Sequence, residues 1–141
     1  MDETERIDDV RARYPGSTTF VFGDGPELNR QLLELVRSGR KTATCMALRD
    51  VEDGKEAMPQ VGRRDLSLTW DGLPALVIET VSVEIVRFRN VSAAFALAEG
   101  ENTTLAGWQR DHQSYFARNG GFDADMKVVC ERFRVIEDLA D

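Results

Sequence analysis

The Asp71-Gly72 pair constrains the fold of this chain most, because it separates two β-prone runs, residues 66–70 and 73–78. Asp-Gly favours a two-residue turn whose twist matches that of paired strands. These runs are therefore predicted to form an antiparallel hairpin. The chain must then contain an antiparallel sheet, whatever helices surround it.

Four more segments have strand character: residues 18–22, 42–47, 81–86 and 127–137. Apolar residues at helical spacing predict helices at residues 4–14, from Pro26 to Ser38 and after Thr103 or Thr104, with a short helix capped by Ser92. Residues 49–64 are charged, contain glycine and show no periodicity, which predicts a loop. Hairpins dominate over strand–helix alternation, so we expect an α+β fold, a small β-barrel of about six strands with helices at its mouth.

Composition limits the function classes. With 141 residues the chain is expected to be a single domain, residues 1–141, in which residues 1–17 form a peripheral N-terminal helix. Its net charge of −7 argues against extensive wrapping of nucleic acid but allows a local basic pocket. No signal peptide or membrane-spanning run is recognised, and the two cysteines are expected to be reduced, so we expect a cytoplasmic protein that does not bind membranes.

Residues 39–44, Gly-Arg-Lys-Thr-Ala-Thr, mark the candidate site, because a helix ends there and a strand begins. This turn is predicted to bring the Lys41 ammonium and the Thr44 hydroxyl close together at the mouth of the sheet. A simpler interpretation is a helix C-terminus with two cations near the negative end of the helix dipole. On this stretch alone the simpler interpretation is favoured.

Chemistry with these groups needs an acid as well. A hydroxyl becomes nucleophilic when a neighbouring group takes its proton, and a carboxylate can position a lysine. Glu99 and Glu101 flank Gly100 in an irregular segment, although acids ahead of a helix are also favoured by its dipole alone. With one histidine and two scattered cysteines, metal chemistry is not expected, and His112 is predicted to be a packed residue on an apolar stripe.

Several segments together resemble the ASCH domain family, over about residues 20–137. They are residues 22–24, 35–36, 39–44, 61–62, 77–80, 98–101 and 129–133, together with Trp108 and His112. The resemblance implies a fold like that of the RNA-binding PUA domain, with the Gly-x-Lys motif in a cleft. Some ASCH members hydrolyse the amide of N4-acetylcytidine and related acylated cytosine nucleosides, at least one is a ribonuclease, and the family as a whole is thought to bind RNA.

The resemblance implies site residues in this sequence. In the amidohydrolases the active residues are the motif's lysine and threonine and the glutamate of a Glu-Asn-x-Thr-Leu run, which fall on Lys41, Thr44 and Glu101. The expected function is thus a hydrolase of acylated cytosine nucleosides without cofactor, metal or protein partner. The alternatives are RNA binding and metal-independent RNA cleavage in the same cleft. Further candidate substrate contacts are Arg40, Thr42, Glu99, Trp108 and His112, although a Trp/Tyr stripe is more often core.

Overall fold

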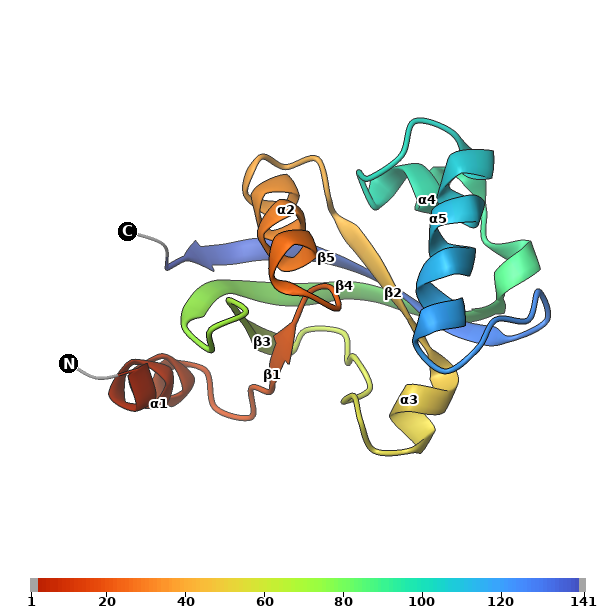
Figure 1. The fold of residues 1–141 in the computed structure, drawn as a ribbon. Helices are drawn as coiled ribbons and strands as arrows, with labels where there is room; N and C mark the ends of the chain where they lie inside the picture. Colours follow the sequence, from red (N-terminus) through yellow and green to blue (C-terminus); the bar gives the residue numbers. More distant parts are fainter. Residues whose placement is uncertain (1–2, 140–141) are drawn as a thin grey trace.

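The computed structural model describes residues 3–139 and has one five-stranded sheet with helices around it (Figure 1). The strands are β1 (Thr19–Val21), β2 (Ala43–Ala47), β3 (Arg64–Leu68), β4 (Pro74–Arg87) and β5 (Lys127–Asp138). The helices are α1 (Glu3–Arg13), α2 (Pro26–Arg37), α3 (Leu48–Glu52), α4 (Ala93–Ala98) and α5 (Leu105–Arg118), with a 3₁₀ turn at Phe88–Asn90. The expected α+β class is confirmed.

The sheet has the order β1-β3-β4-β5-β2. Strand β1 runs parallel to β3, and all other neighbours are antiparallel. The Asp71-Gly72 hairpin is confirmed: it joins β3 to β4, and Gly72 has a φ of 86°, which suits glycine. Strands β1 and β2 are the two edges of the sheet, yet both line one cavity, so the sheet curls into a half-barrel.

The expected count of six strands was one too high. Residues 73–78 and 81–86, predicted as separate strands, are parts of the single long strand β4. Its register against β5 shifts between Thr80 and Ser82, which marks a β-bulge. A bulge bends a strand without ending its pairing. The change in sequence pattern at this point therefore indicated a bend rather than a break.

Among the described residues, three apolar clusters hold the helices on the sheet. Helix α2 packs Leu32, Leu33 and Val36 against one face, on Leu76, Ile78 and Phe133. Helices α4 and α5 cover the β2–β5 end through Phe95, Trp108 and Phe116. Helix α1 packs Val10 on Leu66 and Val77, and Val77 alternates with the residues beneath α2, so α1 and α2 lie on opposite faces of the sheet (Figure 1).

Most helices begin and end close to where the local sequence pattern predicted. The Ser92 hydroxyl accepts a hydrogen bond from the Phe95 amide at 3.1 Å, and the Thr104 hydroxyl accepts one from the Gly107 amide at 3.0 Å. The predicted loop at residues 49–64 is wrong at its start, where α3 forms. The Arg49 guanidinium donates to the carbonyls of Asn119 and Gly121. This tertiary anchor is not visible in the periodicity of the segment.

Candidate active site at the open edge of the sheet

Lys41 enters the protein interior directly after α2. Gly39 adopts a φ of 81°, and the amides of both Arg40 and Lys41 donate to the Leu35 carbonyl at 3.0 Å. This tight reversal points the Lys41 side chain inward, where only 2% of the residue is exposed. Gly100 packs against the same turn so closely that a Cβ there would lie 2.4 Å from the Arg40 carbonyl oxygen. The turn and the segment around Gly100 therefore fix each other.

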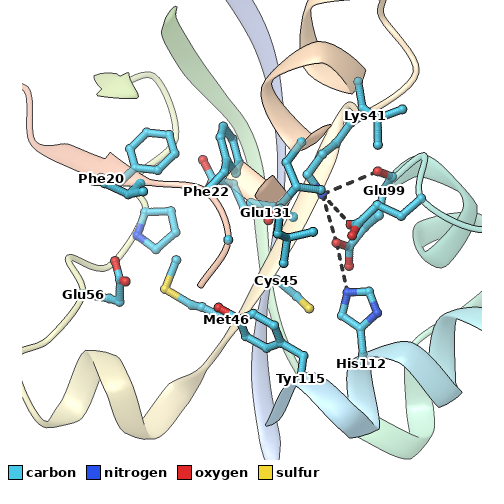
Figure 2. A pocket seen from close by; sticks show the side chains of 18 of the residues that line it. Phe20, Phe22, Lys41, Cys45, Met46, Glu56, Glu99, His112, Tyr115 and Glu131 are labelled. Atoms are coloured by element: carbon cyan, nitrogen blue, oxygen red, sulfur yellow. Dashed lines mark hydrogen bonds and ion pairs between the residues drawn. The ribbon is translucent and has the colours of Figure 1, made fainter. Parts of the chain in front are cut away.

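The Lys41 ammonium lies between two carboxylates (Figure 2). Its Nζ is 3.1 Å from Glu99 Oε1 and 3.0 Å from Glu101 Oε2. Burial alone would lower the pKa of Lys41, but the charges of Glu99 and Glu101 outweigh it and raise the pKa. The lysine is therefore held as a cation at neutral pH.

Trp108 and His112, both on α5, also contact the Glu99 carboxylate. The Trp108 indole Nε1 donates to Glu99 Oε2 at 2.9 Å, and His112 Nε2 lies 3.4 Å from Glu99 Oε1. Burial would raise the pKa of Glu99, but Lys41 and His112 reverse this and lower it to about 2. His112 Nδ1 lies 2.9 Å from the Trp108 carbonyl, and a carbonyl only accepts, so Nδ1 carries the hydrogen. Glu99 is thus an ionised, fully engaged partner of Lys41.

A cavity of about 480 Å³ opens beside these groups. Its walls come from the two edge strands, from α2 and α5, and from the segment between α3 and β3. Aromatic and apolar side chains line one part of it, namely Phe20, Phe22, Met46 and Tyr115 (Figure 2). The remainder is polar and includes Lys41. Such a mixture of apolar walls and a few convergent polar groups is typical of small-molecule sites.

The cations that line this cavity already have acidic partners. Lys41 pairs with Glu99 and Glu101, Arg63 lies 2.9 Å from Asp65, and Arg118 lies 2.6 Å from Asp24. Within the part of the chain that the structure describes, the lining holds three cations and six carboxylates, the acids being Glu56, Asp65, Glu99, Glu101, Asp111 and Glu131. The cavity therefore carries an excess of negative charge, which disfavours a phosphate-bearing ligand.

The structure brings together most of the residues that the sequence indicated. Lys41, Thr44, Glu99, Glu101 and His112 all line the cavity. Within residues 3–139 the Thr44 hydroxyl makes no hydrogen bond, so it is available to a ligand.

Three other predicted substrate contacts lie elsewhere. Arg40 and Thr42 are exposed outside the cavity, and the Thr42 hydroxyl donates to the Ala98 carbonyl at 3.3 Å. Trp108 is completely buried and packs between Phe88 and His112. The Trp108 indole hydrogen-bonds to Glu99 rather than facing the cavity. Trp108 is therefore a core residue, as the alternative interpretation of the sequence had it.

Sequence reasoning missed Glu131, a buried acid in the cavity wall. It pairs in register with Thr44 across β2 and β5, so the two side chains share one face of the sheet. Its Oε2 accepts a hydrogen bond from the Thr80 hydroxyl at 2.7 Å. Burial raises the pKa of Glu131, and this outweighs the lowering by the Thr80 hydrogen bond, while the charge of Asp65 raises the pKa and that of Arg63 lowers it. One feature of the sequence could have indicated it: Glu131 lies between Val129 and Phe133, two apolar residues on the same side of the predicted strand.

The half-barrel and its cavity define this chain as an α+β protein of the PUA-like class. The chain belongs to the ASCH domain family, whose sequence model matches residues 18–137. Among the residues that the structure describes, no helix has the length and apolar character to cross a membrane.

Solved structures agree with this assignment. An ASCH domain from Lactobacillus crispatus is 32% identical and superposes with a TM-score of 0.78, covering 90% of this chain and 84% of the other. Protein EF3133 from Enterococcus faecalis is also 32% identical, with a TM-score of 0.80 and coverage of 95% and 87%. An ASCH protein from Zymomonas mobilis shares the fold at 10% identity and a TM-score of 0.53, over 87% and 73% of the two chains. No curated protein matches the sequence significantly.

Proposed function

We propose that this protein hydrolyses the amide of an acylated cytosine nucleoside, such as N4-acetylcytidine, in the cavity beside Lys41. The observation that carries the proposal is a charged, buried lysine in the same cavity as an unengaged threonine hydroxyl. A fixed cation stabilises the oxyanion that forms when a hydroxyl attacks an amide carbonyl. The resemblance to the ASCH amidohydrolases, which use the equivalent lysine, threonine and glutamate, supports the same assignment.

Because Lys41 is paired with two carboxylates that favour its charged form, it suits the role of oxyanion partner better than that of base. Glu101 and Glu99 hold the ammonium in place. Thr44 attacks the acyl carbon, and its proton passes to a carboxylate. Glu131 suits this role, since cross-strand partners have Cβ atoms about 4.5–5.5 Å apart, and a general base can act directly or through one water.

The remaining steps balance with the same groups. When the tetrahedral intermediate collapses, the bond to the exocyclic nitrogen breaks, and the proton held by Glu131 goes to the leaving amine. Water then attacks the acyl-threonine ester, with Glu131 again accepting a proton, and the carboxylic acid and the Thr44 hydroxyl are released. The aromatic wall of Phe20, Phe22 and Tyr115 offers surfaces against which a cytosine ring packs.

Charge separates this proposal from RNA binding and RNA cleavage. Both alternatives require negatively charged phosphate to bind in a cavity whose lining holds more carboxylates than cations. The three cations in the cavity lining are paired, and Arg40 lies outside it. A neutral nucleoside fits this site better than a nucleotide or a long RNA.

The test is release of cytidine from N4-acetylcytidine by purified protein, followed by chromatography. Thr44→Ala should abolish turnover while retaining the fold. Thr42→Ala is the matched control, because this neighbouring threonine is exposed and lies outside the cavity. Absence of turnover by the folded wild-type protein, or full activity of Thr44→Ala, would overturn the proposal.

A further inference from the structure

Three side chains from separate parts of the chain meet near the Lys41 ammonium. Cys45 comes from β2, Glu99 follows α4 and His112 lies on α5 (Figure 2). One ligand atom of each, a thiol sulfur, a carboxylate oxygen and an imidazole nitrogen, all lie within 4.8 Å of one another. Cys45 and His112 are partly exposed to the cavity, whereas Glu99 is buried. Sulfur, nitrogen and oxygen donors of this kind are the ligands of protein-bound zinc.

Trp108 orients two of these donors. Its carbonyl accepts the hydrogen of His112 Nδ1, which leaves Nε2 directed towards Glu99. Its indole nitrogen donates to Glu99 Oε2, which leaves Oε1 on the side of His112. Metal-binding histidines and carboxylates are held by such outer contacts, which fix the tautomer and the ring orientation.

The separation of the two donor atoms fits a metal. His112 Nε2 and Glu99 Oε1 are 3.4 Å apart. Tetrahedral zinc with bonds of about 2.0–2.1 Å to nitrogen and oxygen holds two such ligands about 3.4 Å apart. A direct charged hydrogen bond would instead be about 2.7–2.9 Å long. An ion could therefore bridge the two atoms with little movement of either side chain.

We propose that Cys45, Glu99 and His112 form a zinc-binding site, whose fourth position opens to the cavity for water or a donor atom of a bound ligand. The Cys45 thiolate and the Glu99 carboxylate would balance the two charges of the ion. Glu101 remains to balance Lys41, whose ammonium also donates to Oε1 of the ligating Glu99 carboxylate. This site goes beyond the proposed hydrolysis, since neither Cys45 nor His112 has a role in that reaction.

The experiment is a titration of metal-free protein with Co²⁺ as a spectroscopic substitute, followed by displacement with Zn²⁺, without any nucleoside present. We expect one equivalent to bind with a thiolate-to-cobalt charge-transfer band. Cys45→Ser should remove that band, and Cys45→Ser and His112→Gln should each weaken zinc binding by more than the about 10–100-fold loss that follows removal of an outer-shell partner. Circular dichroism establishes that each variant is folded.

Cys130→Ser is the matched control, because Cys130 is the cross-strand partner of Cys45 and also carries a free thiol. It should bind zinc like the wild type. Absence of the charge-transfer band in the wild type, or equal zinc affinity in wild type and Cys45→Ser, would overturn the site. Because the readout is binding alone, the result does not depend on whether the protein hydrolyses N4-acetylcytidine.

Discussion

Replacing Lys41 by methionine should destabilise the fold by about 3–5 kcal/mol, the usual cost of removing one partner from a buried ion pair. Methionine retains most of the lysine's apolar stem but leaves Glu99, which is 1% exposed, without its cation. His112 Nε2 remains 3.4 Å from this carboxylate, which places the expected loss at the lower end of that range. With a urea slope of about 1–3 kcal/mol per molar, the unfolding midpoint should fall by at least about 1 M.

The assay is urea unfolding monitored by tryptophan fluorescence, in which Trp108 reports directly because it contacts Glu99. The double variant Lys41→Met/Glu99→Gln removes the uncompensated charge and keeps a carbonyl oxygen for the indole N–H. It should recover more than half of the lost stability. A loss below about 1 kcal/mol in Lys41→Met, or no recovery in the double variant, would refute the reasoning that the buried charge sets the cost.

Four further variants test other parts of the site. Gly100→Ala should cost more than about 1 kcal/mol by thermal unfolding, since its Cβ would meet the Arg40 carbonyl, whereas Gly39→Ala, with similar φ but open space around it, should lose less. Trp108→Phe should cost at least about 1.5 kcal/mol by urea unfolding, because it deprives a buried carboxylate of a donor. Because the pKa of Glu131 is raised, the folded protein keeps a proton at pH values where the unfolded chain has released it. The contribution of Glu131 to folding stability therefore falls as the pH rises above 4.5. Glu131→Gln should match the wild type near pH 4 and be the more stable protein at pH 8, and an unchanged pH profile would contradict this.

Much of the fold could be predicted from local signals, because the responsible interactions span few residues. The Asp71-Gly72 turn, the Ser92 cap and the Thr104 cap each involve backbone groups within three or four positions. The meeting of Lys41 with Glu101 was also indicated by sequence, through the resemblance and through the search for an acid in an irregular segment. The structure then added their distance and the burial of the lysine.

Other features depend on tertiary contacts that no sequence spacing encodes. The bulge in β4 follows from pairing with β5, and α3 is held by contacts of Arg49 with the segment after α5. The cluster of Cys45, Glu99 and His112 unites Cys45 with two residues more than fifty positions further along the chain, so sequence reasoning found no metal-like spacing. Glu131 was overlooked because its hydrogen-bond partner, Thr80, lies on another strand and 51 positions away in the chain.

In the proposed reaction Thr44 is the nucleophile, Lys41 stabilises the oxyanion and Glu131 accepts the proton. The most direct measurement is peptide mass spectrometry of protein quenched in acid during reaction with N4-acetylcytidine, for the wild type and Glu131→Gln. We expect an acetyl group on Thr44 in the wild type and much slower acetylation in Glu131→Gln. Turnover with no acetylation of Thr44, or acetylation at another residue, would contradict it.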